Sequence, residues 1–243
     1  MLVLVAILTS VAFSASTVKG SATGEAAGLS TDSGTYTVSN PYGPITITCK
    51  AGTTASASVT WSLDGDAAIL TTVKKGMGAD VKKVGTGATI APLAPKEIST
   101  LTTKDVTLVV TLPAGGTYNV VGGEGDVSVK GCKGTADVRN TKGGLAIEGS
   151  LTTLKANAPN GDVTAILRSG TLSAASSIDA AVGNIHMQMP EFSAGVTAAA
   201  SNIHMEMPEF KTTSEAAGSL IGAMGKGGAM LMLNAPKGTI NLK

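Results

Sequence analysis

Two histidines and a glutamate stand in a segment that occurs twice in the chain. The nonapeptide NIHMQMPEF, residues 184–192, recurs 18 residues later as NIHMEMPEF, residues 202–210. Its apolar residues alternate, which predicts strands with Ile and Met facing inward and with His186, His204 and Glu206 facing outward. If successive copies stack, two imidazoles and a carboxylate lie side by side. Such a set of ligands can hold Zn²⁺ or Cu²⁺.

A solvated ladder of polar side chains without metal fits the same pattern. We predict no resident cofactor, and a Zn or Cu ion at His186, His204 and Glu206 is the alternative hypothesis. The methionines of the two nonapeptides are Met187, Met189, Met205 and Met207. They are expected to fill a narrow core. With the faces reversed, they would instead form an exposed thioether patch suited to Cu(I).

The chain has two cysteines, Cys49 and Cys132, which are 83 residues apart. In an exported protein such a pair can form one disulfide. Cys49 also continues the alternating series Ile45, Ile47, Cys49, which is typical of a small buried hydrophobe. Both interpretations stay open. Two cysteines without neighbouring histidines do not make a zinc site.

Signatures of catalysis are weak. Around Gly225 and Lys226 the sequence lacks the first glycine and the Ser or Thr of a phosphate-binding loop. The acids Asp126, Asp162 and Asp179 lie near predicted turns, where Asp commonly bonds its own backbone. Neither histidine has an evident Ser or Cys partner for a triad. We predict that the protein is not an enzyme, and a glycan-active enzyme is the catalytic alternative.

Short strands and glycine turns must position these residues. Turn signals followed by alternating apolar residues begin at residues 125, 144, 161, 183, 201, 228 and 238. A unit of this length cannot bury its inner face alone, but stacked units can. The sequence therefore predicts an all-β fold, namely a single-stranded parallel β-solenoid (β-helix) with about 18–20 residues per coil and an N-terminal cap. A β-sandwich is the competing fold, and the recurrence of a whole nonapeptide disfavours it.

Four segments are expected along the chain. Residues 1–18, which carry no charge before Lys19, form a signal peptide or a retained hydrophobic segment. The others are a linker (19–34), a first coil with a hairpin and a capping loop (35–103), and the solenoid repeats (104–243) with an inserted loop near 211–228.

Composition restricts the core and the partners. Charged residues make up 14% of the chain, the net charge is +1, and 3% of residues are aromatic, while 31 are glycine. The core must therefore be thin and built from small side chains. Without a basic face, nucleic-acid binding is disfavoured.

Several segments together resemble a known family. They are VSNPYGPITI (38–47), DVTLVVTLPAGGTYNVVGGEGDVSVKG (105–131), KGTADVRNTKGGLAIEG (133–149) and ANAPNGDVTAIL (156–167). The pattern resembles the bacterial and archaeal putative-adhesin β-solenoid domain, a cell-envelope family of unknown function, over residues 35–243. The resemblance implies a fold and a location, and it brings no catalytic residues.

These observations favour a non-catalytic exported β-solenoid that acts as a structural or adhesive protein of the cell envelope or extracellular space. One alternative is a self-assembling filament subunit that uses stacking or a retained N-terminal helix. The other is a weak metal-binding surface protein that uses stacked histidines. The expected partners are cell-surface or envelope components or further copies of the chain, not nucleic acid. A membrane is contacted only if the N-terminal segment is retained.

Overall fold

The computed structural model describes residues 16–168, 170–190 and 192–243. The predicted signal peptide or retained segment, residues 1–18, lies outside the described residues except for positions 16–18, which begin the first strand. Within the described residues, neither helix has the length and apolar character needed to cross a membrane.

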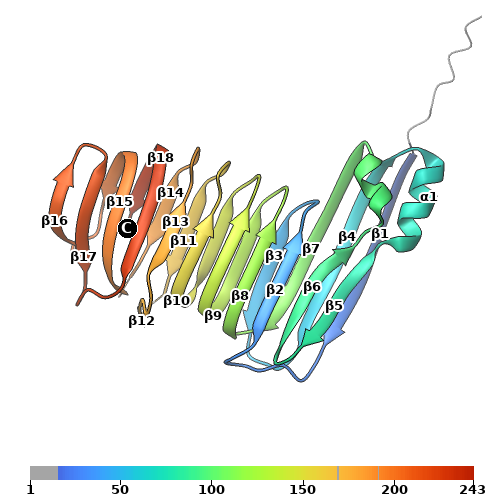
Figure 1. Ribbon diagram of the computed structural model, residues 1–243, viewed down its shortest axis with the longest axis horizontal. Coiled ribbons are helices and arrows are strands. Elements are labelled where there is room, and N and C mark those ends of the chain that lie inside the picture. Colours follow the sequence, from blue (N-terminus) through green and yellow to red (C-terminus); the bar gives the residue numbers. More distant parts are fainter. Residues whose placement is uncertain (1–15, 169, 191) are drawn as a thin grey trace, which may run out of the picture.

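Strands make up most of the described chain (Figure 1). Those of the N-terminal half are β1 (Ser16–Ala26), β2 (Thr35–Asn40), β3 (Ile45–Lys50), β4 (Ala55–Gly65), β5 (Gly78–Val84), β6 (Gly87–Leu93), β7 (Thr103–Pro113), β8 (Gly115–Gly122) and β9 (Val127–Asn140). Those of the C-terminal half are β10 (Leu145–Asn157), β11 (Val163–Leu167), β12 (Gly170–Thr171), β13 (Ser176–Asp179), β14 (Ile185–Gln188), β15 (Phe192–Met205), β16 (Lys211–Ala216), β17 (Ser219–Met224) and β18 (Met230–Leu242). The helices are α1 (Ala67–Gly76) and the 3-10 helix η1 (Lys96–Thr100).

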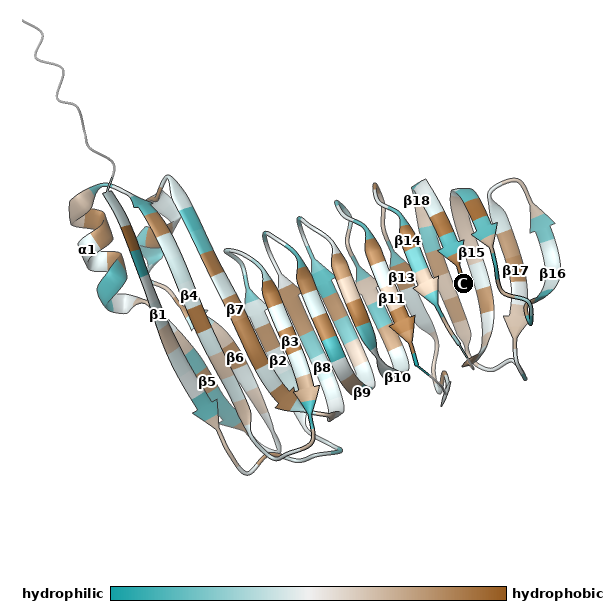
Figure 2. Ribbon diagram, turned by 180° about the vertical axis from the view of Figure 1, so that it is seen from behind, coloured by the Kyte–Doolittle hydropathy of each residue, from teal (hydrophilic) through white to brown (hydrophobic). Residues whose placement is uncertain are grey.

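Parallel pairing stacks apolar residues into columns. Val127 of β9 lies opposite Leu145 of β10, and Leu145 lies opposite Val163 of β11, with an offset of 18 residues each time. The members of this column are Leu108, Ile45, Val127, Leu145, Val163, Ile185, Ile240 and Ile203. All except Ile203 are at most 2% exposed. Figure 2 shows the apolar residues alternating with polar ones along the strands, so one face of each strand supplies the core.

The all-β class is confirmed, but the predicted single-stranded parallel β-solenoid is wrong. Five strands, β10, β11, β14, β18 and β13, pair in parallel as a small closed barrel, each with the next and the last with the first. The other strands are peripheral to this ring, and several of them are antiparallel, including β1 with β4, β4 with β7 and β16 with β17.

The order of strands at the C-terminal end also departs from a sequential stack. β18 pairs with β14 through Ile240 opposite Ile185, and with β15 through Ile240 opposite Ile203. The last strand therefore lies between the two copies of the nonapeptide. An alternating apolar pattern specifies which face of a strand is buried, and several strands here share that pattern. The repeat therefore predicted the buried face and not the neighbouring strand.

The predicted linker, residues 19–34, is partly a strand. β1 continues to Ala26 and pairs antiparallel with β4 along its whole length, from Ser16 opposite Gly65 to Ala26 opposite Ala55. The sequence of β1, STVKGSATGEA, alternates small or apolar residues with polar ones, and burial alternates in the same register. The inward-facing positions are mostly Gly and Ala, so the apolar signal is weak and the segment resembles a linker in sequence.

The segment 35–103 contains more regular structure than the predicted coil, hairpin and capping loop. Asp66 accepts hydrogen bonds from the backbone N–H groups of Ala68 and Ile69, and it thereby caps helix α1 at its N-terminus. The predicted capping loop is largely the antiparallel hairpin of β5 and β6, which pair from Gly78 opposite Leu93 to Val84 opposite Gly87.

The predicted inserted loop near 211–228 is also a hairpin. β16 pairs antiparallel with β17, and β17 pairs antiparallel with the first half of β15. The sequence of β16, KTTSEA, has no apolar alternation that could indicate a strand, and every residue of this strand is exposed. This hairpin places Met224, at the end of β17, opposite Ala194 of β15.

Two tyrosines are stacked in the core of the N-terminal half. The ring centroids of Tyr36 and Tyr118 are 5.5 Å apart, with 23° between the ring planes. The Tyr118 hydroxyl donates a hydrogen bond of 2.7 Å to the backbone oxygen of Pro113. Burial raises the pKa of Tyr118 well above its ordinary value, and the neighbouring Tyr36 adds to the shift.

Replacing Tyr118 with Phe is expected to lower the free energy of unfolding by about 1–2 kcal/mol at neutral pH, because the buried carbonyl of Pro113 loses this donor. The variant should also respond less to alkali. The folded-state pKa of Tyr118 lies above the ordinary value of 10.0, so the linked stability is present below that pH and is lost as the pH rises through the folded pKa. Urea unfolding from about pH 8 to 12 measures both effects. Equal alkaline slopes for the two proteins would contradict this prediction.

Candidate functional site at the C-terminal end of the sheet

His186 and His204 are not direct neighbours. His186 on β14 lies opposite Asn241 of β18, and Asn241 lies opposite His204 on β15. Because one pairing step is about 4.8 Å, the two histidine backbones are about 10 Å apart. The adjacency expected from the 18-residue recurrence is therefore wrong, because β18 separates the two copies.

The polar side chains of the predicted metal site have other partners. Nδ2 of Asn241 lies 3.1 Å from Nδ1 of His186, and Nδ2 of Asn202 lies 3.2 Å from Nε2 of His204. The Glu206 carboxylate forms an ion pair of 3.1 Å with Nζ of Lys243. Across residues 16–243, within the described parts, no three His, Cys, Asp or Glu side chains are gathered to hold a metal ion. Metal binding by His186, His204 and Glu206 stays a prediction, but the two histidines are not on neighbouring strands as that prediction assumed.

The methionines of the repeat point inward, as predicted. Met187 and Met189 are 1% exposed, whereas Met205 and Met207 are only partly buried. The difference arises because the second copy lies nearer the end of the sheet, with fewer strands beyond it. The exposed thioether patch that reversed faces would have produced is absent from these described residues.

A cavity of about 430 Å³ lies at this end of the molecule. Its walls are formed by Gln188, Met189, Pro190, Met207, Pro208, Glu209, Met224 and Lys243. The two Met-Pro pairs are the same position in the two nonapeptides, on either side of the end of β18. Backbone hydrogen bonds fix this end: Lys243 donates to the oxygen of Met187 and accepts from the N–H of Met189.

Beyond the cavity, one strand edge is open. β18 pairs with one side of β15 along residues 195–205, but β17 covers the other side only along residues 194–199. Among the described residues, no strand pairs with the outer side of residues 201–205. Ile203 and Met205 there are partly exposed, although their counterparts Ile185 and Met187 are buried.

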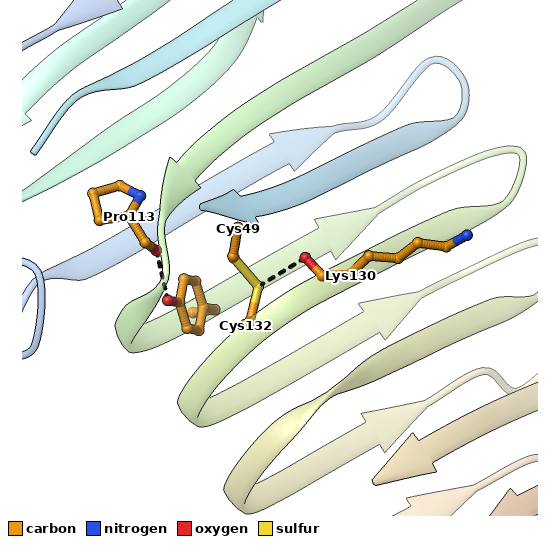
Figure 3. The surroundings of a disulfide bond; sticks show 5 residues. Cys49, Pro113, Lys130 and Cys132 are labelled. Atoms are coloured by element: carbon orange, nitrogen blue, oxygen red, sulfur yellow. Dashed lines mark hydrogen bonds between the residues drawn. A yellow bond between two sulfur atoms is a disulfide. The ribbon is translucent and has the colours of Figure 1, made fainter. Parts of the chain in front are cut away.

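The cysteines of the N-terminal half form a disulfide (Figure 3). Cys49 at the end of β3 and Cys132 on β9 are bonded, with their Cα atoms 4.9 Å apart. Both residues are also buried, so the two interpretations that the sequence left open both hold. β3 and β9 are directly paired, with Thr48 opposite Lys130, and the disulfide lies where this pairing ends.

Sequence reasoning missed Met224 and the two prolines as parts of the site. Pro190 and Pro208 belong to the repeated nonapeptide, so the repeat itself was a signal that could have found them. Met224 lies in the segment predicted as an inserted loop, and only the pairing of β17 with β15 brings it to the cavity.

No protein-family model matches this sequence, and no curated protein matches it. Among solved structures, one described as a putative cell adhesion protein from Clostridium sporogenes is 13% identical with a TM-score of 0.44, over 92% of this chain and 99% of that chain. A putative adhesin from Bacteroides fragilis is 12% identical with a TM-score of 0.39, over 92% and 97% of the two chains. A putative adhesin from Parabacteroides distasonis is 11% identical with a TM-score of 0.32, over the same 92% and 97%. The chain is thus similar in structure to bacterial proteins described as adhesins, at low identity.

Proposed function

We propose that the protein is an exported structural or adhesive protein of the cell envelope or extracellular space, and that it acts by binding a partner and not by catalysis. The observation that carries this proposal is the open edge of β15 at residues 201–205. An unpaired edge offers a row of backbone N–H and C=O groups to an extended segment of another protein, and side chains beside it supply specificity. Partly exposed Ile203 and Met205 provide apolar contacts for such a segment.

Export is supported by the disulfide. Disulfides persist in oxidising compartments and are rare in the cytosol. The chain has two cysteines, and both are in the Cys49–Cys132 bond.

Self-association is the second candidate function, and the same open edge favours it. Two copies can join their edges in antiparallel fashion about a twofold axis, which satisfies the free backbone groups of both. This assembly gives a dimer, because the edge used by each copy is consumed.

The Ile203→Lys variant is expected to weaken binding to the partner at least about tenfold, because a charge on an edge strand obstructs strand addition. The measurement is the binding of labelled purified protein to intact cells of the source organism, alongside light scattering for the mass of the protein alone. Val121→Lys is the matched control, since Val121 is 50% exposed on β8 and lies far from the edge.

Each outcome separates the alternatives. Loss of cell binding by Ile203→Lys alone supports the adhesive role. A wild-type dimer that becomes monomeric only in Ile203→Lys supports self-association. Equal behaviour of the two lysine variants, with both folded by circular dichroism, would contradict a role for this edge.

A further inference from the structure

Three methionines line the cavity at the C-terminal end, and they come from three different parts of the chain. Met189 follows β14, Met207 follows β15, and Met224 ends β17. Met189 and Met207 are equivalent positions of the repeated nonapeptide, which places them on opposite sides of the end of β18. The hairpin of β16 and β17 then folds back along β15 and adds the third sulfur.

The walls of this cavity are poorly suited to an added strand. Pro190 and Pro208 have no backbone N–H, so neither corner can donate to a peptide in the cavity. The N–H of Met189 is already bonded to the oxygen of Lys243. The apolar part of the walls comes from three methionines and two prolines.

Charge at the rim favours a cation. Glu209 lines the cavity and makes no ion pair within the described part of the chain. Glu206 stands beside the rim, and its carboxylate is balanced by Lys243. The rim thus carries one uncompensated negative charge, which attracts a monovalent cation and adds to its affinity.

We propose that this cavity binds a soft monovalent metal ion, Cu(I), through the sulfurs of Met189, Met207 and Met224. Thioethers are soft, neutral ligands that select Cu(I), whereas Zn²⁺ prefers thiolate, imidazole and carboxylate. Methionine has three rotatable bonds, so its sulfur can adjust its position toward an ion in the cavity. This inference is independent of the adhesive role. It assigns the metal ligands to methionine sulfurs, whereas the sequence predicted histidine nitrogens.

The cysteines do not compete for the ion. The chain has two cysteines, and both are in the disulfide. A soft metal ion bound at low concentration therefore has only thioethers and two imidazoles to choose between.

Titration of the full chain with Ag⁺, a redox-stable probe of Cu(I) sites, tests the proposal. Isothermal calorimetry is expected to show one tight site per chain, and the NMR signals of methionine methyl groups are expected to shift for the three cavity residues. Met207→Leu should weaken binding at least about tenfold, because it removes one ligand at nearly constant volume. Met232→Leu is the matched control, since Met232 is 52% exposed on β18 and does not line the cavity. Anaerobic Cu(I) titration against a chromophoric chelator should give the same order of affinities.

Three results would overturn the proposal. The first is the absence of a stoichiometric Ag⁺ site. The second is equal binding by the folded Met207→Leu and Met232→Leu variants. The third is loss of binding in a His186→Ala/His204→Ala variant with retention in Met207→Leu, which would assign the ion to the histidines.

Discussion

Reduction of the Cys49–Cys132 disulfide is expected to lower the free energy of unfolding by about 4 kcal/mol. The bond joins residues that are 83 positions apart, so cutting it restores much conformational freedom to the unfolded chain. In the folded protein, the direct pairing of β3 with β9 holds the reduced thiols close together. The native fold therefore changes little on reduction, and the effect falls mainly on the unfolded state.

Urea unfolding with and without dithiothreitol measures this effect. The Cys49→Ala/Cys132→Ala variant is the control: it should start at the lower stability and show no response to the reductant. Unchanged stability of the wild type after complete reduction, verified by thiol titration, would contradict the prediction.

A second large effect is expected from a column of glycines at successive turns. Its members are Gly143, Gly161, Gly183 and Gly238. A Cβ on Gly161 would collide with the backbone oxygen of Gly143, and a Cβ on Gly183 would collide with that of Gly161. The same holds for Gly238 against Gly183. Backbone atoms in paired strands cannot move aside as a flexible side chain can, so the turns stack closely only without side chains.

Gly183→Ala is expected to lower the free energy of unfolding by about 2–3 kcal/mol, because the added methyl forces apart two paired strand ends. Gly78→Ala is the matched control. A Cβ there meets only the side chain of Leu93, which is 48% exposed and free to turn, so a change of about 0.5 kcal/mol or less is expected. Thermal unfolding of the two variants compares them. A loss in Gly78→Ala as large as that in Gly183→Ala would show that backbone contact is not the cause.

The buried face of the strands could be predicted from the sequence. Alternation in the nonapeptides placed Met187 and Met189 inward and His186 outward, and burial agrees. Period two is a local property that every strand carries in its own residues, so it needs no knowledge of neighbours. The turn glycines were also predictable, because a turn signal is likewise a local property of the sequence.

The order of strands could not be predicted. Ile240 and Leu242 have the same alternation as Ile203 and Met205, so either strand fits beside β14 by apolar pattern alone. The predicted metal site depended on that order. His186 and His204 were expected on neighbouring strands and are separated by β18, although their side chains face outward as expected. Strand β1 escaped prediction because its inward-facing residues are mostly Gly and Ala, which give only a weak apolar alternation.

The insertion of β18 between the two nonapeptides underlies the cavity, the separated histidines and the open edge. NMR of isotope-labelled protein tests it most directly, through nuclear Overhauser effects between backbone protons of neighbouring strands. The structure predicts contacts of Asn241 with both His186 and His204, and none between the two histidines. Direct contacts between His186 and His204, without Asn241, would contradict it.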